Sequence, residues 1–151
     1  MNDYHPNPKE YDARMHSAEH ILNQTMVRLF NCGRAFSAHI EKKKSKCDYR
    51  FDRGLAEEEI SAIENKVNEI IQANLPIRER LLSRQEASQV VSLAKLPDDA
   101  GKSVRIINIG DYDVCACSGL HALTTREIGT FKIISTDFAN DRLRIRFHLE
   151  I

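Results

Sequence analysis

The sequence predicts an α+β fold in which a mainly antiparallel sheet packs against two longer helices. Two segments repeat apolar residues every three or four positions, as amphipathic helices do. Short strand-like runs occupy much of the rest, and the last four follow one another closely. Helices interrupt these strands irregularly, which favours antiparallel pairing over the regular strand–helix alternation of a doubly wound parallel sheet.

The first half of the chain predicts a helix, a hairpin and a second helix. The first helix spans Tyr11–Phe30. Two strand-like runs follow, Ala35–Glu41 and Cys47–Asp52, and the basic tip at 42–46 joins them as a hairpin. The second helix spans Ala56–Ala73, and its acidic first turn complements the positive end of the helix dipole.

The second half is mainly strands. A strand over Ile77–Leu82 leads into a short helix, Arg84–Leu93, and then a loop over Pro97–Lys102. A tight turn at Asn140-Asp141 separates the last two strands. The four closely spaced strands are predicted at Val104–Ile109, Tyr112–Cys117, Thr130–Phe138 and Arg142–Glu150.

Length and composition bound the class of protein. The 151 residues predict one domain over 1–151, with 1–10 as an N-terminal arm. Apolar residues at 42% and charged residues at 29% exclude a disordered or collagen-like chain. We expect no membrane span and no signal peptide, and a cytoplasmic location follows by default. Basic and acidic residues both number 22, so any RNA contact has to use a local patch.

Two histidines lie one helical turn apart on the first predicted helix. His16 and His20 occupy positions i and i+4, which puts both imidazoles on one face with β-carbons about 6 Å apart. A single metal ion can bridge such a pair. The chain has six histidines, so chance alone also produces such a pair and the signal is weak by itself.

A second ligand pair lies far downstream, in Cys117-Ser-Gly-Leu-His121. A turn at Gly119, just after a predicted strand, can swing His121 back toward the cysteine. Thiolate and neutral imidazole are preferred zinc ligands, so the two pairs together predict a tetrahedral zinc site. Cys115 lies on the same strand face as Cys117, and is either an alternative ligand or a small packing residue.

The remaining cysteines and histidines have no partner at ligand spacing. We interpret Cys32 and Cys47 as packing residues. His5, His39 and His148 are interpreted as ordinary surface or hydrogen-bonded histidines.

Glu19 completes the sequence His-Ser-Ala-Glu-His, which matches the inverted zinc motif of some metallopeptidases. In those enzymes the glutamate is the general base, and a further downstream carboxylate completes the metal site. Here Cys117 and His121 compete for that place, so a metallopeptidase is a less favoured alternative. The simplest interpretation of Glu19 is a solvated helix carboxylate.

With both ligand pairs in view, the chain resembles the free-standing alanyl-tRNA editing proteins, and more broadly the second additional domain of alanyl- and threonyl-tRNA synthetases. The family's His-x-x-x-His and Cys-x-x-x-His motifs match His16, His20, Cys117 and His121. Three further segments agree, and the similarity spans Arg14 to Ile151. These segments are Tyr49–Asp52, Ile63–Ile70 with Leu75–Ile77, and Thr125–Ile133.

The chain also departs from the family pattern. The synthetase form of the second motif is Cys-Gly-Gly-Thr-His, whereas this chain has Ser118-Gly-Leu120 in the middle. The glycine-rich domain of longer editing proteins and the parts needed for ATP-dependent aminoacylation are missing, so we expect no need for ATP.

The resemblance implies a zinc-dependent aminoacyl-tRNA hydrolase that removes serine or glycine from mischarged alanine tRNA. It assigns Zn²⁺ to His16, His20, Cys117 and His121, or to three of these, which would act in catalysis through the metal. Four protein ligands would make a closed site of structural type, whereas three would leave an open position for direct catalysis. Ser37 stands where the small members carry a hydroxyl residue linked to serine recognition, although it can equally be an ordinary strand serine. A catalytically inactive, zinc-stabilised tRNA-binding module is the alternative.

Local clusters of positive charge are candidates for RNA binding. The predicted hairpin tip carries one cluster, Lys42, Lys43, Lys44 and Lys46, with Arg34 expected nearby. Three arginines alternate along the last predicted strand and share one face. The alternative is a solvated loop and edge strand, because basic residues also protect sheet edges from aggregation. The three arginines are Arg142, Arg144 and Arg146.

Overall fold

The computed structural model describes residues 12–91 and 103–150. The expected N-terminal arm, the loop at 97–102, His5 and the end of the short helix at Leu93 lie outside these residues. The chain forms α1 (Ala13–Phe30), β1 (Ser37–His39), β2 (Ser45–Arg50), α2 (Glu57–Gln72), β3 (Ile77–Ser83), α3 (Arg84–Ser88), β4 (Ser103–Ile109), β5 (Asp113–Ala116), the 3₁₀ helix η1 (Thr125–Ile128), β6 (Thr130–Ala139) and β7 (Arg142–Glu150).

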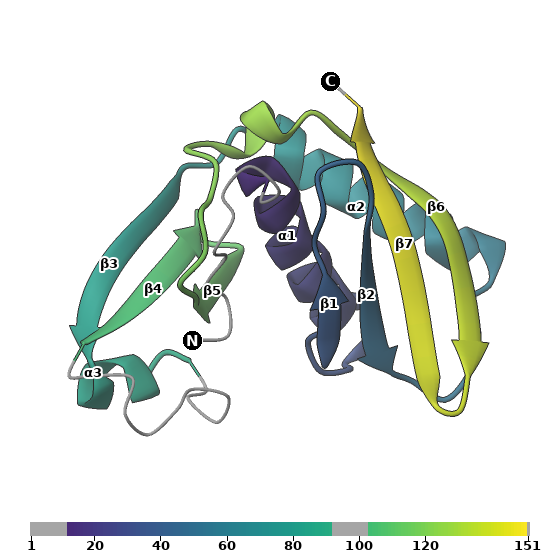
Figure 1. Ribbon diagram of the computed structural model, residues 1–151, viewed down its shortest axis with the longest axis horizontal. Coiled ribbons are helices and arrows are strands. Elements are labelled where there is room, and N and C mark those ends of the chain that lie inside the picture. Colours follow the sequence, from purple (N-terminus) through teal and green to yellow (C-terminus); the bar gives the residue numbers. More distant parts are fainter. Residues whose placement is uncertain (1–11, 92–102, 151) are drawn as a thin grey trace.

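The strands form two antiparallel sheets. One has the order β1-β2-β7-β6 and the other β3-β4-β5. The α+β class and the antiparallel pairing are thereby confirmed, and the strands are divided between two sheets. Helix α1 lies between the sheets, and α2 packs on the side of the four-stranded sheet that faces α1 (Figure 1).

Local caps account for the ends of α1. The Asp12 side chain accepts hydrogen bonds from the backbone N–H groups of Arg14 and Met15, at 2.9 and 3.2 Å. At the other end Asn31 adopts the left-handed conformation, with φ of 54°. Asparagine tolerates this conformation better than most residues, so the helix ends at Phe30.

The four-stranded sheet has one apolar face and one polar face. Leu143, Ile145 and Phe147 of β7 are fully buried toward the helices. The arginines between them point to the opposite side, because side chains alternate along a strand. β7 pairs with β2 on one side and β6 on the other, so it is a central strand. The interpretation of its arginines as protection of an edge strand is therefore wrong.

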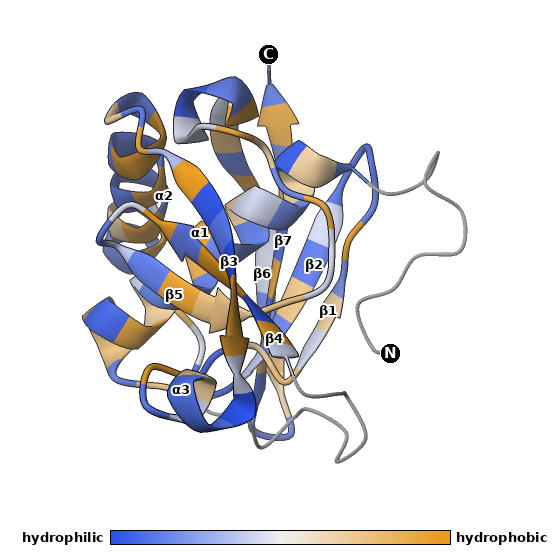
Figure 2. Ribbon diagram, turned by 90° about the vertical axis from the view of Figure 1, so that its left-hand side faces the viewer, coloured by the Kyte–Doolittle hydropathy of each residue, from blue (hydrophilic) through white to orange (hydrophobic). Residues whose placement is uncertain are grey.

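The three-stranded sheet also carries polar and apolar residues along its strands (Figure 2). Ile107 and Ile109 of β4 join the main core with α1 and α2. Val104 and Ile106, on the other face, form a small second core with Ala87 of α3. Of the helices in the described ranges, none is long and apolar enough to cross a membrane.

Candidate metal centre

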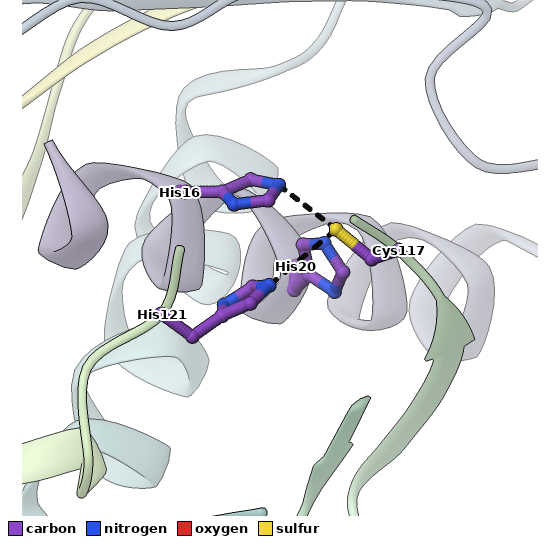
Figure 3. Close-up of side chains that lie close together, drawn as sticks. All are labelled: His16, His20, Cys117 and His121. Atoms are coloured by element: carbon purple, nitrogen blue, oxygen red, sulfur yellow. Dashed lines mark hydrogen bonds between the residues drawn. The ribbon is translucent and has the colours of Figure 1, made fainter. Parts of the chain in front are cut away.

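Four potential metal ligands converge between α1 and the segment after β5. Their ligand atoms all lie within 4.8 Å of one another. His16 and His20 are 4% and 3% exposed, Cys117 is 6% exposed, and His121 is partly buried. Figure 3 shows the three imidazoles and the thiol pointing toward a common point.

The distances within this cluster fit a tetrahedral zinc ion. Cys117 Sγ lies 3.4 Å from His16 Nε2 and 3.5 Å from His121 Nε2. A tetrahedron with Zn–S of about 2.3 Å and Zn–N of about 2.0 Å has S···N edges of about 3.5 Å. The residues present therefore fit zinc in ligand type and number, and these two distances match the edges of a tetrahedral site.

Hydrogen bonds orient two of the histidine rings. His16 Nδ1 lies 3.0 Å from the carbonyl oxygen of Leu120, and a carbonyl can only accept. His121 Nδ1 lies 3.0 Å from Ser17 Oγ, which also accepts from the backbone N–H of Ala122. With the proton on Nδ1 in both rings, both Nε2 lone pairs face the cluster. Such partners fix the tautomer of metal-binding histidines.

Asp113 faces the third ring. Its Oδ2 lies 3.5 Å from His20 Nδ1, a buried atom without a hydrogen-bond partner among the described residues. The Asp113 side chain is fully buried and accepts hydrogen bonds from Gln24 Nε2 at 2.8 Å and Arg34 Nη1 at 2.7 Å. Asp113 thus links α1, β5 and the segment before β1.

The titration of these groups follows from their surroundings. Burial, together with the neighbouring His20 and His16, keeps the pKa of His121 well below its ordinary value. Burial alone would raise the pKa of Asp113, but His20 and Arg34 outweigh it and hold that pKa well below the usual range. A neutral imidazole is the form that binds a metal, and an ionised carboxylate is the form that supports a ligand histidine.

Arg105 of β4 holds the turn that carries the second ligand pair. Its Nη1 donates to the carbonyl oxygens of Cys117 at 3.0 Å and Gly119 at 2.7 Å. The same guanidinium pairs with Glu79 on β3. The backbone N–H of Gly119 points back to Cys117 Sγ at 3.4 Å. The Cys-x-x-x-His turn is thereby fixed to the three-stranded sheet.

Glu19 is not a solvated helix carboxylate, and that interpretation is wrong. Its side chain is 13% exposed, and Oε1 lies 3.7 Å from His16 Nε2. Asn23 Nδ2 donates to Oε2 at 2.8 Å. The carboxylate therefore lies beside the ligand cluster.

The structure brings together only part of the predicted site. His16, His20, Cys117 and His121 converge, whereas Cys115 lies outside this group. Arg34, which was expected near the lysines of the hairpin tip, forms an ion pair with the buried Asp113. Its guanidinium is engaged in the interior instead.

Ser37 and the lysines lie apart from the cluster. Ser37 is directly opposite Asp48 in the β1–β2 pairing, so the two share a sheet face. Cys47 and Tyr49 of β2 are buried on the other face, where the Tyr49 hydroxyl donates to Asn23 of α1. The register therefore places Ser37 away from α1. The exposed residues Lys42, Lys43 and Lys44 connect β1 to β2.

Ordinary contacts account for four further cysteines and histidines within the described residues, namely Cys32, Cys47, His39 and His148. Cys47 is fully buried in the main core, and the half-buried Cys32 packs against that core. His39 pairs with Glu41 at 2.9 Å and His148 with Glu150 at 3.6 Å.

Sequence reasoning missed Asp113 and Ser17 as supports of the ligand rings. Asp113 lies two and four positions before Cys115 and Cys117, so an extended strand places all three on one face. This spacing could have indicated that the Asp113 carboxylate lies near the ligands. No local signal connected Ser17 with His121, because their hydrogen bond spans 104 positions.

Comparison with known proteins shows similarity to a domain of aminoacyl-tRNA synthetases. The family model described as the threonyl and alanyl tRNA synthetase second additional domain matches residues 104–145. This range contains Cys117 and His121 and covers most of the segment from β4 to β7.

Full-length relatives match a larger part of the chain. It is 36% identical over 124 residues to an alanine–tRNA ligase of Coxiella burnetii, a match that covers 81% of this chain and 14% of the relative. The alanine–tRNA ligases of Leptospira biflexa and Francisella tularensis subsp. novicida are 35% and 33% identical, over 81% and 85% of this chain. The chain spans only 13–15% of the length of these three relatives.

Proposed function

The chain belongs to the family of the threonyl and alanyl tRNA synthetase second additional domain, and we propose that it is a zinc-dependent aminoacyl-tRNA hydrolase. The proposed substrate is alanine tRNA mischarged with serine or glycine, and the reaction is hydrolysis of the ester between amino acid and tRNA. The proposed place of action is the cytoplasm, and the reaction requires no ATP.

One observation carries this proposal. Two ligand pairs, about a hundred positions apart in the chain, form one cluster of zinc-ligand spacing within a chain similar to alanine–tRNA ligases. A zinc ion held by three of these four residues would keep an open position, from which it would act as a Lewis acid toward the ester carbonyl or an attacking water.

The protein's own residues have defined tasks in this scheme. Leu120 and Ser17 orient two ligand rings, and Asp113 faces the third. Arg105 holds the turn from Cys117 to His121 in place. These contacts pre-organise the site before a substrate arrives, which lowers the cost of reaching the reactive geometry.

Physical limits on amino-acid selection explain why such a hydrolase is useful. A pocket that accepts alanine excludes larger side chains by size. It rejects glycine or an added hydroxyl only weakly, because a methyl group or an uncompensated hydroxyl is worth only a few kcal/mol at most. A second, hydrolytic site removes the errors that binding alone admits.

The proposed partner is the tRNA itself. Lys42, Lys43 and Lys44 are exposed on the β1–β2 connection and can approach phosphates. A role of Ser37 in serine recognition is a hypothesis from the sequence alone, and the strand register, which places Ser37 away from α1, does not favour it.

The test is hydrolysis of mischarged tRNA. The protein is incubated with alanine tRNA carrying serine or glycine, and with threonine tRNA carrying serine, and the loss of the ester is followed. We expect deacylation of at least one substrate, and its loss in a His16→Ala/His20→Ala variant. Elemental analysis of both proteins, with and without chelator, should show one zinc per chain and none in the variant.

A different outcome points to the second candidate function. Four protein ligands at zinc spacing are also typical of a closed, structural zinc site. This observation favours a tRNA-binding module without hydrolytic activity. Such a module would retain zinc and bind tRNA but leave every ester intact, and that result would refute the hydrolase.

A further inference from the structure

The four-stranded sheet has a face that no described helix covers. We call the outer face the side of this sheet opposite α1 and α2. The strand register places six cationic side chains and three carboxylates on it. The cations are Lys46, Arg50, Lys132, Arg142, Arg144 and Arg146, and the carboxylates are Asp48, Asp137 and Glu150. The face is therefore positive within a chain of formal net charge zero.

Like charges face one another directly across its strands. Lys46 is opposite Arg146, and Arg50 is opposite Arg142, in the pairing of β2 with β7. Like charges directly opposite in a sheet destabilise the fold. Because β2 and β7 are paired on both sides, protection of a free sheet edge does not explain the positive charge on these two strands.

The carboxylates of the outer face compensate only some of its cations. Asp48 accepts two hydrogen bonds from Arg144, at 2.8 and 2.9 Å. Asp137 pairs with Arg146 at 2.7 Å and Arg142 at 3.5 Å.

Three cations remain without such compensation. Among residues 12–91 and 103–150, no carboxylate lies within ion-pair distance of Lys46, Arg50 or Lys132. Arg50 and Lys132 are exposed, and Lys46 is half-buried. These side chains are available to an anionic partner.

Arg50 also stacks on an aromatic ring. Its guanidinium carbon lies 3.9 Å from the centroid of the ring of Phe36, a residue that is 38% exposed. Stacking holds the guanidinium plane in place and leaves its N–H groups available to phosphate oxygens. The positive charge continues beyond the start of β2, next to Lys46, in the exposed residues Lys42, Lys43 and Lys44.

We propose that the outer face binds the phosphate backbone of RNA. Cations that recur along adjacent strands, about 6.6 Å apart on each strand, suit a partner with regularly repeated negative charge. The inference rests on the proposed function for its choice of RNA as that partner. RNA binding relieves the cross-strand repulsion that the free protein carries between β2 and β7.

The position of the outer face defines its role in turnover. The ligand residues lie on α1 and just after β5, and these elements are on the other side of the four-stranded sheet (Figure 1). Contacts at the outer face are therefore with the body of the RNA and not with the reacting ester. They strengthen substrate and transition state equally, so their loss raises KM and leaves kcat unchanged.

Binding of uncharged alanine tRNA tests this proposal without relying on hydrolysis. The test variant is Lys46→Gln/Arg50→Gln/Lys132→Gln. The matched control is Lys66→Gln/Arg78→Gln/Arg126→Gln, which, like the test variant, removes two exposed cations and one half-buried cation. We expect the test variant to bind about 10- to 100-fold more weakly at 0.15 M salt, with a salt slope smaller by about 2 to 3. The control should stay within about two-fold of the parent.

A second readout uses the unaltered protein. Acetylation of lysines in the presence and absence of tRNA should show protection of Lys46 and Lys132 but not of Lys66. The thermal midpoint of the test variant should equal or exceed that of the parent, because its substitutions remove like-charge pairs.

The outcomes separate this inference from the proposed function. Unchanged tRNA affinity of the test variant would overturn the inference, even if the parent deacylates mischarged tRNA. The inference would also be overturned if the test variant lost binding to phosphatidylserine vesicles but kept its RNA binding, because the outer face would then be a lipid-binding site. If the parent binds tRNA through this face but hydrolyses no ester, the inference holds and the proposed hydrolase fails.

Discussion

Replacing Asp113 with asparagine should weaken metal binding without removing a ligand. The substitution preserves the size of the side chain but removes the charge that faces His20 Nδ1 at 3.5 Å. Loss of a carboxylate behind a ligand histidine typically lowers metal affinity by about 10- to 100-fold. We therefore expect the zinc dissociation constant of Asp113→Asn to rise by that factor.

The same substitution should also destabilise the fold. Arg34 loses a carboxylate that accepts from both of its terminal nitrogens, at 2.7 and 3.3 Å. Breaking a buried ion pair by removing one partner costs about 3–5 kcal/mol. The Arg34 side chain is 28% exposed and keeps some contact with water, so we expect a smaller loss of about 2–3 kcal/mol. That corresponds to a fall in the thermal midpoint of about 5–10 °C.

Chelator competition measures the affinity, at a temperature where both proteins are folded. The matched control is Asp111→Asn, which removes an exposed carboxylate two positions away. Its zinc affinity and midpoint should match those of the parent. A folded Asp113→Asn variant that binds zinc as tightly as the parent would refute the reasoning. Asp113 would then serve only as the partner of Arg34.

Three further predictions concern residues around the site and the sheet. Glu19→Gln should keep the deacylation rate within about ten-fold of the parent, because ester hydrolysis needs less base assistance than peptide hydrolysis and the new amide still accepts the hydrogen bond from Asn23. A loss of about 10³-fold would make Glu19 an essential acid–base group and revive a peptidase-like mechanism. Ser37→Ala should leave the ratio of the rates on serine- and glycine-charged alanine tRNA unchanged, because the strand register places Ser37 on the face away from α1. A rate loss of about 3–30-fold confined to the serine-charged substrate would instead identify Ser37 as a recognition residue. Asp48→Asn should lower the free energy of unfolding by about 1–2 kcal/mol at pH 7, measured by urea denaturation, because the hydrogen bond from Arg144 holds the pKa of Asp48 below its usual value. This contribution to stability is present above the unfolded-state pKa of about 3.9 and is lost as the pH falls through the lower folded-state pKa. The free energies of unfolding of parent and variant should therefore converge in acid. A constant difference between them down to about pH 2 would contradict this origin.

Local patterns explain which parts of the fold the sequence predicted closely. The predicted helix Ala56–Ala73 differs from α2 by one residue at each end, and the predicted strand Arg142–Glu150 coincides with β7. Both have strong periodicity and a local signal at their start, which is an acidic first turn for the helix and the tight turn at 140–141 for the strand. Cap geometry is subtler, and α1 begins at Ala13, two residues later than expected.

The spacing within each ligand pair was also readable in the sequence, because four residues span one helical turn or one tight turn. The joining of the two pairs was anticipated from a resemblance and from the chemistry of zinc. Their actual convergence depends on how α1 packs against β5, a contact across about a hundred positions.

Tertiary structure alone decided the remaining features. The alternation of arginines along 142–146 determined that they share a face, but only the pairing of β7 with β2 and β6 made that strand central. Likewise, Arg34 has no sequence signal for Asp113, which lies 79 positions away. A period in the sequence specifies which side of an element is apolar, because that depends on neighbours in the chain. Which element covers that side, and which charges then meet, depends on packing between distant segments.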